Sequence, residues 1–253
     1  MKNNTVHFLW VNGDLNKIGK LSLSSFKINK FNPILWTYSK NDINFCDIEI
    51  RDANEILDYK KIFKNKKDSY ASFSDLFRYT VLMKCGGIWA DTDVISLKDC
   101  NQLDLSKAFL VQEYDKFRKL KLILNKNNTV INNNIICLPN PEAGNIIDLA
   151  RAYSEVYRKD LIEWSELGPK LLSGLVKMNP HHGFILKKPV FSNPFPFWKI
   201  PKILLEPHVK IPPSAHFLHC YNECWRNFSV DPNAEYPVNS IMSKLELKYL
   251  DRK

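Results

Sequence analysis

The sequence has no run of about 18 uncharged apolar residues, so it predicts no membrane-spanning helix. Its start, MKNNTVHFLWVNGD, also lacks the longer apolar stretch and the small-residue cleavage site of a secretory signal. There is no internal repeat, no low-complexity linker and no sharp change of composition. We therefore expect a cytoplasmic protein in which residues 1–253 form a single domain.

Cysteine is too scattered for a disulfide framework. Six cysteines are spread over 253 residues, whereas disulfide scaffolds concentrate theirs in short secreted chains. Free thiols are therefore expected. An alternative is a structural zinc site near the C-terminus, formed by His216, His219, Cys220 and Cys224. Adjacent His and Cys ligands are awkward, and no second CxxC pair supports that alternative.

Acidic residues are in deficit, with 27 Asp and Glu against 36 Lys and Arg and a net charge of +9. Such a surface attracts anions. Basic residues cluster at 60–67 and at 116–121; these runs are either solvated surface or a patch that gathers anionic lipid. Short signatures of nucleic-acid binding are missing, so we expect no nucleic-acid partner and keep a basic nucleic-acid-binding module only as an alternative.

The apolar pattern of the first fifty residues predicts an α/β fold. Residues 6–11 form an apolar, β-branched and aromatic run that stops at a turn, and residues 31–39 and 48–50 look like further strands. A helix is expected over residues 15–29. The order strand, helix, strand favours an open, mostly parallel, Rossmann-like sheet flanked by helices.

The second half is expected to be less regular. Residues 141–159 and 168–177 have the composition of helices, and the asparagine-rich stretch 125–134 looks like a loop. Prolines recur between residues 189 and 213 too often for long helices.

The clearest helix covers residues 68–84, where apolar side chains recur at helical spacing. Asp68 or Ser69 is the expected N-cap, and Gly86-Gly87 ends the helix. After the glycines, a short strand over residues 88–90 leads into an acidic turn.

That turn contains Asp91 and Asp93, two carboxylates separated by one residue. In an extended chain such residues point to the same side, and paired carboxylates suit Mg²⁺ or Mn²⁺, which bridges the phosphates of a nucleotide. A D-x-D tripeptide alone is common in surface turns. On the preceding helix, Asp75 and Arg78 are three residues apart and share a face, so they can pair or reach a common polar ligand.

From Ser74 to Asp93 the chain resembles the GT-A glycosyltransferases with a DXD sugar-binding region. That family includes bacterial capsule and lipopolysaccharide transferases, eukaryotic α-galactosyl and mannosyl transferases, and the glucosylating domain of clostridial toxins. Its pattern is an S-D-x-x-R-Y helix before G-G-x-Y-x-D-x-D, and here Trp89 replaces the tyrosine as the donor-site aromatic. The resemblance covers most of residues 5–97. It implies a GT-A fold with a nucleotide-sugar-binding half at about 1–100 and an acceptor-binding half with a closing loop at about 101–253.

The resemblance also implies roles for particular residues. Trp10 corresponds to the aromatic that stacks on uracil, which agrees with the affinity of a base for an indole ring. Asp75 and Arg78 correspond to residues that contact the ribose and sugar of the donor. Asp91 corresponds to the first acid, near the ribose and sugar hydroxyls, and Asp93 to the direct ligand of Mn²⁺ or Mg²⁺. Catalysis is therefore expected to depend on Asp91, Asp93 and Arg78.

Later segments resemble the family more weakly. Asn133 matches an asparagine that precedes a strand near the donor sugar, and Gly168-Pro169 matches a motif near the acceptor. His219 matches a late histidine that completes the metal shell, with His216 as the alternative. Beside it, Asn222 is the expected further metal ligand, and Trp225 is the expected donor-binding tryptophan of the closing loop.

The implied reaction moves a sugar from a nucleotide-sugar, expected to be a UDP-hexose, to a saccharide acceptor with retention of configuration. The basic surface suggests a lipid-linked or lipopolysaccharide-type acceptor and a peripheral position at the inner face of the plasma membrane. A metal-dependent phospho- or nucleotidyltransferase is the alternative enzyme, although a P-loop is missing. No nucleophile is evident, and Glu113 and Glu223 are candidates for a base or stabilising acid.

Overall fold

The computed structural model describes residues 4–39, 45, 48–114, 129–157, 162–163 and 165–251. Within this part of the chain one sheet contains seven strands in the order β3-β2-β1-β4-β7-β6-β8. Strand β7 is antiparallel to both of its neighbours, β4 and β6, and the other neighbouring strands are parallel. The strands are β1 (Thr5–Trp10), β2 (Asn32–Thr37), β3 (Glu49–Asp52), β4 (Gly87–Ala90), β6 (Phe109–Gln112), β7 (Ile131–Leu138) and β8 (Ile185–Lys187).

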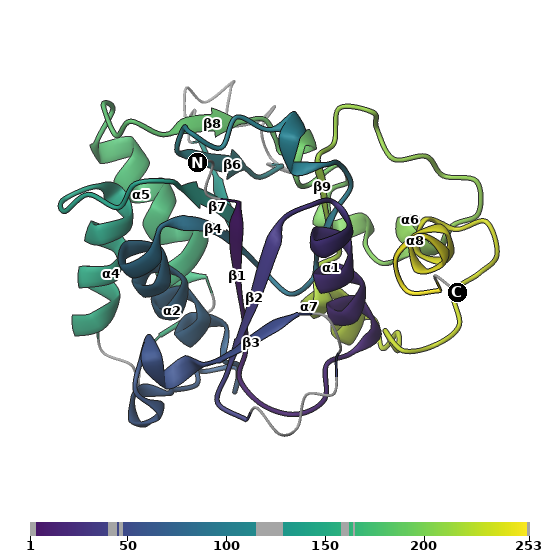
Figure 1. Ribbon diagram of the computed structural model, residues 1–253, viewed down its shortest axis with the longest axis horizontal. Coiled ribbons are helices and arrows are strands. Elements are labelled where there is room, and N and C mark those ends of the chain that lie inside the picture. Colours follow the sequence, from purple (N-terminus) through teal and green to yellow (C-terminus); the bar gives the residue numbers. More distant parts are fainter. Residues whose placement is uncertain are drawn as a thin grey trace.

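Helices cover both flanks of this sheet (Figure 1). Helices α2, α4 and α5 lie on one flank, and α1 lies on the other, followed outward by α6 and α8. The open, mostly parallel α/β sheet flanked by helices is therefore confirmed. The helices are α1 (Lys17–Ile28), α2 (Ala71–Cys85), α4 (Ile146–Val156), α5 (Leu171–Met178), α6 (Lys202–Leu205), α7 (Asn222–Asn227) and α8 (Ile241–Tyr249).

Strand β1 explains why both faces of the sheet are apolar. Its side chains alternate between the two faces, so Phe8 joins the core beside α1 and Leu9 joins the core beneath α2. Because helices cover both faces, both residues are buried and the strand reads as a continuous apolar run. A third core, which includes Ile18 and Trp225, fills the space around α1 and α8.

Helix α2 ends as the sequence predicts, but it begins differently. Gly86 and Gly87 both have positive φ, 64° and 88°, a conformation that costs glycine little, and they turn the chain into β4. The predicted N-cap at Asp68 or Ser69 is wrong, because the helix follows Tyr70, which makes no side-chain cap. Asp68 instead lies in a preceding turn and pairs with Lys64 at 2.9 Å.

A small second sheet joins distant parts of the chain. Strand β5 (Val94–Ser96) pairs antiparallel with β9 (Phe217–His219), so that Val94 lies opposite His219. This pairing brings the C-terminal cluster, the segment from His216 to Trp225, to the acidic turn. The main sheet takes strands from both halves of the chain, and the division into donor and acceptor halves remains a prediction.

Two expectations from composition concern thiols and membrane crossing. Cys85, Cys100, Cys137, Cys220 and Cys224 are free thiols, as expected. Cys46 and the basic run at 116–121 lie outside the described residues. In the described ranges, no helix has both the length and the apolar character needed to cross a bilayer.

Candidate active site

The acidic turn follows directly from β4. The backbone N–H of Asp91 donates to the carbonyl of Asn134 on β7 at 2.9 Å, and the N–H of Val94 closes the turn onto the Asp91 carbonyl at 3.0 Å. These bonds hold the two carboxylates at the end of a buried strand. Strand β5 then leaves the turn toward β9.

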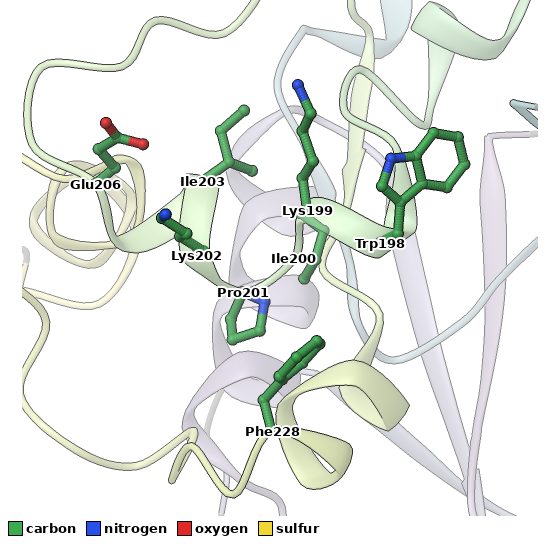
Figure 2. Close-up of a pocket in the computed structure, with 8 residues that line it drawn as sticks. All are labelled: Trp198, Lys199, Ile200, Pro201, Lys202, Ile203, Glu206 and Phe228. Atoms are coloured by element: carbon green, nitrogen blue, oxygen red, sulfur yellow. The ribbon is translucent and has the colours of Figure 1, made fainter. Parts of the chain in front are cut away.

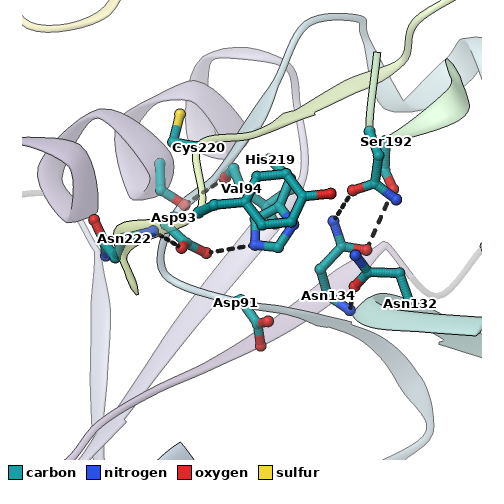
Figure 3. A network of polar contacts seen from close by, with 12 residues as sticks. Asp91, Asp93, Val94, Asn132, Asn134, Ser192, His219, Cys220 and Asn222 are labelled. Carbon is teal, nitrogen blue, oxygen red and sulfur yellow. Dashed lines mark hydrogen bonds and ion pairs between the residues drawn. The ribbon is translucent and has the colours of Figure 1, made fainter. Parts of the chain in front are cut away.

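Asp93 faces the C-terminal cluster (Figure 3). One carboxylate oxygen lies 3.3 Å from Nε2 of His219, and the other accepts the backbone N–H of Asn222 at 2.7 Å. The backbone N–H of Cys220 also donates to the Asp93 carbonyl at 2.8 Å. Asp93 and His219 are each 8% exposed, so the contact is largely removed from water.

Two polar atoms at this site are buried and have no hydrogen-bond partner, Nδ1 of His219 and Oδ1 of Asn222. Buried polar atoms are rarely left unpaired, and each exception calls for an explanation such as an ion. Ligand atoms of Asp91, Asp93 and His219 also lie within 4.8 Å of one another. Carboxylate and amide oxygens with one imidazole suit a divalent cation such as Mn²⁺, so these residues fit the metal that the sequence predicts.

The zinc alternative finds no support. Among the described residues, the cluster of metal-binding side chains contains Asp91, Asp93 and His219 and no cysteine. His216 instead stacks on Phe191, with ring centroids 4.7 Å apart.

The pKa values of Asp93 and His219 are shifted in opposite directions. Burial opposes charge on both groups, but the Asp93 carboxylate raises the pKa of His219 above its usual value. Burial alone would likewise raise the pKa of Asp93, but the charge and hydrogen bond of His219 hold that pKa below its usual value. The opposite shifts favour a carboxylate beside an imidazolium.

A second network surrounds Arg78, which is 4% exposed. One of its terminal nitrogens lies 3.2 Å from Asp75 and 3.1 Å from Asp91, and the other donates to the backbone carbonyl of Asn133. The Asp75–Arg78 pairing expected from helical spacing is therefore present. Trp89 supports the network through two contacts. Its indole N–H donates to Asp91 at 2.8 Å, and its ring centroid lies 5.0 Å from the guanidinium carbon of Arg78.

The carboxylates around Arg78 are strongly affected by burial. Burial raises the pKa of Asp75 to about 6, even though Arg78 and Asn133 pull it down. Burial and the charge of Asp93 raise the pKa of Asp91, against the effect of Arg78. A buried cation between two acids of raised pKa is typical of a site prepared for a polar ligand.

The asparagines of β7 correct one expectation. Asn132, Asn133 and Asn134 lie inside a strand, not in a loop or before a strand. Their amides are satisfied by specific partners: Asn133 donates to Asp75 at 2.7 Å, whereas Asn132 donates to Glu113 at 2.5 Å. Because successive side chains point to opposite faces, only the middle residue reaches the Arg78 network.

Gly168 approaches this network closely. A Cβ atom at this position would lie 2.6 Å from Nδ2 of Asn133 and 2.9 Å from both carboxylate oxygens of Asp75. The preceding residue is held in place, because the Tyr79 hydroxyl donates to the Leu167 carbonyl at 2.8 Å. The predicted Gly168-Pro169 step therefore lies against the Arg78 network.

Tyr221 is a site residue that the sequence does not single out. Its ring stacks on the imidazole of His219, and its hydroxyl donates to Glu113 at 2.8 Å. Its position two residues after His219 was the only available signal. Of the two candidate acids, Glu113 therefore lies at the site, whereas Glu223 pairs with Arg226 on α7.

The two tryptophans predicted to bind the donor lie in different surroundings. Trp10 ends β1, is only partly buried, and donates its indole N–H to the Gly13 carbonyl at 2.8 Å. Trp225 is 1% exposed and donates to the Cys220 carbonyl at 2.9 Å. The structure therefore leaves Trp10 accessible and does not bring Trp225 to the surface of the site.

Residues 15–110 match the family model described as a glycosyltransferase sugar-binding region containing a DXD motif. This range contains Asp75, Arg78, Asp91 and Asp93. This segment is therefore similar to a DXD-type glycosyltransferase region. The DXD region thus supplies the acidic turn and the Arg78 network, while His219 and Asn222 come from beyond it.

Solved structures similar to the chain include glycosyltransferases, and a search of curated proteins finds no match. PaToxG glycosyltransferase is 18% identical, over 70% of this chain and 69% of that chain, with a TM-score of 0.47. GlyE of Streptococcus pneumoniae TIGR4 is 13% identical over 98% of this chain and 60% of that chain, with a TM-score of 0.47. LgtC is 12% identical over 93% of this chain and 85% of that chain, with a TM-score of 0.40. Likeness at this level assigns neither a donor nor an acceptor.

Proposed function

We propose that this chain is a metal-dependent glycosyltransferase that moves a hexose from a UDP-sugar to a saccharide acceptor and retains the anomeric configuration. The observation that carries the proposal is the convergence of His219 on Asp91 and Asp93, the two acids of the DXD region. The buried, unpartnered Nδ1 of His219 and Oδ1 of Asn222, whose backbone N–H contacts Asp93, support a cation site.

In this proposal Asp93, His219 and Asn222 hold Mn²⁺ or Mg²⁺. A bound cation would offset the negative charge of the diphosphate leaving group. His219 and the backbone of Asn222 both contact the Asp93 carboxylate, which holds the segment that carries these two residues at the acidic turn. Preorganised charge of this kind is the main source of rate enhancement in many enzymes.

The Arg78 network is proposed to bind the sugar end of the donor. Asp75 and Asp91 both hold one terminal nitrogen of Arg78, so the guanidinium loses little freedom when a ligand arrives. Asp91, the more exposed of the two acids at 25% of its side chain, is proposed to accept hydrogen bonds from ribose or sugar hydroxyls. Trp89 orients Asp91, Asn133 orients Asp75, and the partly exposed ring of Trp10 is proposed to stack on the base.

We propose a lipid-linked or lipopolysaccharide-type acceptor, bound by the second half of the chain while the protein sits on the inner face of the plasma membrane. The net charge of +9 supports a surface that approaches anionic lipid. Surface polysaccharide synthesis is the corresponding cellular role.

The test is hydrolysis of a panel of UDP- and GDP-sugars with Mn²⁺, with and without a chelator. We expect metal-dependent release of a nucleoside diphosphate from one donor, abolished by Asp93→Ala and retained by Asp99→Ala, which removes a surface carboxylate paired with Lys30. Release of a nucleoside monophosphate would indicate a phospho- or nucleotidyltransferase instead. Failure to bind or turn over any donor, even with acceptor-containing membrane extract, would refute the proposal.

A further inference from the structure

An open cavity of about 410 Å³ lies beside α6, at the opposite flank of the molecule from α4 and α5 (Figures 1 and 2). Its lining is mostly apolar and includes Trp198, Ile200, Pro201 and Ile203. Phe228, which follows α7, closes the other side and points toward Pro201 (Figure 2). None of these side chains belongs to the metal cluster or the Arg78 network.

Two exposed aromatic rings lie at this cavity: Phe228 lines it, and the ring of Phe197 lies 5.2 Å from that of the lining residue Trp198. Phe228 is 62% exposed and Phe197 is 41% exposed. Exposed apolar surface that gathers around a concavity marks an interaction site more often than scattered apolar residues do. We call the cavity together with these two rings the α6 surface.

Positive charge accompanies this apolar surface. Lys199 and Lys202 line the cavity, and Glu206 is the acidic residue among the lining side chains. From Lys187 to Lys210 the chain carries five lysines and one acidic residue. Aromatic rings beside lysines, whose long stems reach past apolar surface to place their charge in water, are the combination found where proteins meet a lipid interface.

We propose that the α6 surface docks this protein on a bilayer that contains anionic phospholipid, with Phe197 and Phe228 entering the interface and Lys199 and Lys202 meeting the headgroups. The inference rests on the proposed function, because it places the donor site beside a membrane-bound acceptor. The distances support that placement: the Phe197 ring lies 6.1 Å from the Tyr221 ring, and Tyr221 stacks on His219.

The test is co-sedimentation of the full chain with vesicles of phosphatidylglycerol and phosphatidylcholine, compared with vesicles of phosphatidylcholine alone. Each lysine near an anionic surface strengthens binding roughly fivefold, so Lys199→Gln with Lys202→Gln should weaken it about 25-fold, whereas Lys199→Arg with Lys202→Arg keeps the charge and should retain the binding of the wild type. Phe228→Ser should weaken vesicle binding roughly tenfold, since it removes an aromatic ring that would enter the bilayer interface. The charge-matched control is Lys60→Gln with Lys61→Gln, in the basic cluster at 60–67.

Circular dichroism of each variant checks folding, and Mn²⁺-dependent donor hydrolysis in solution is measured in parallel. The inference is overturned if the wild-type chain does not bind anionic vesicles, or if the Lys60 and Lys61 variant loses as much binding as the Lys199 and Lys202 variant. Donor hydrolysis without vesicle binding would overturn the docking surface alone. Vesicle binding without turnover of any donor would overturn the proposed function instead.

Discussion

The ring of Tyr221 lies against the imidazole of His219, with centroids 3.7 Å apart and planes 29° from parallel. Glu113 holds the tyrosine hydroxyl at 2.8 Å, so a carboxylate from the end of β6 fixes a ring that in turn fixes a proposed metal ligand. Residues that orient a metal ligand without touching the metal often matter nearly as much as the ligand itself.

Removing that support should weaken metal binding. We expect Tyr221→Leu to raise the Kd for Mn²⁺ about tenfold, because outer partners of metal ligands typically contribute 10- to 100-fold in affinity. Tyr221→Phe keeps the stacked ring and should have a smaller effect. Electron paramagnetic resonance of free Mn²⁺ measures the Kd, with Tyr153→Leu on the exposed surface of α4 as the control. Equal affinity in Tyr221→Leu and wild type would contradict a positioning role for Tyr221.

Metal binding should stabilise the folded chain through Asp93. At a free Mn²⁺ concentration 100 times the Kd, binding to the native state alone adds about 2.7 kcal/mol to the free energy of unfolding. We expect thermal unfolding to show this rise in the wild type and not in Asp93→Asn. If Asp93→Asn is stabilised equally, Mn²⁺ binds elsewhere and the proposed site is wrong.

Gly168 and Gly174 form a matched pair for testing the packing around Asp75. In Gly168→Ala the new methyl group would collide with Asn133 and Asp75, and overpacking of this kind costs about 1–3 kcal/mol. Gly174 lies within α5, and a Cβ added there would have no neighbouring atom within 4 Å, so Gly174→Ala should raise stability by up to about 1 kcal/mol. Urea denaturation measures both changes. If Gly168→Ala leaves the free energy of unfolding unchanged, Asp75 and Asn133 can shift to make room for the methyl group without loss of stability.

His7 should make stability depend on pH. It is 2% exposed, accepts a hydrogen bond from Trp36 and contacts the Gly86 carbonyl, each at 3.1 Å, and burial lowers its pKa to about 4. The unfolded chain takes up a proton near pH 6.5, so the contribution of neutral His7 is fully present above that pH. It is lost as pH falls from 6.5 toward 4, to a total of about 3 kcal/mol.

The corresponding measurement is urea denaturation between pH 7.5 and pH 4.5. His7→Gln cannot titrate, so its stability should fall less than that of the wild type over this range. The same substitution at the exposed His181 is the control. Parallel pH profiles for wild type and His7→Gln would show that His7 is not the source of the dependence.

The sequence predicted best where the decisive interactions are local. Helix α2 follows from apolar spacing and from Gly86-Gly87, and the Asp75–Arg78 contact follows from helical geometry alone. The acidic turn is local as well, because its position depends on the short strand before it. Expectations for the metal-binding and donor-binding roles of these residues remain predictions that the proposed assays test.

Contacts between distant segments could not be predicted in the same way. The pairing of β5 with β9, which brings His219 to Asp93, leaves no periodic signal in either three-residue strand. The polar residues of β7 look like a loop, because nothing local reveals that Asp75 and Glu113 will satisfy their amides. At such positions the contacts made in the folded protein, and not local propensity, decide the secondary structure.

Because β9 comes late in the sequence, the residues of the proposed metal site are translated at different times. A chain emerging from the ribosome as far as Lys187 already contains every strand of the seven-stranded sheet in the described residues, together with Asp91 and Asp93. It does not yet contain His219 or Asn222. The nascent protein therefore passes through a stage in which the sheet can form while two of the three proposed cation ligands are still to be translated, so capture of the metal has to wait until β9 and the first residue of α7 have been made.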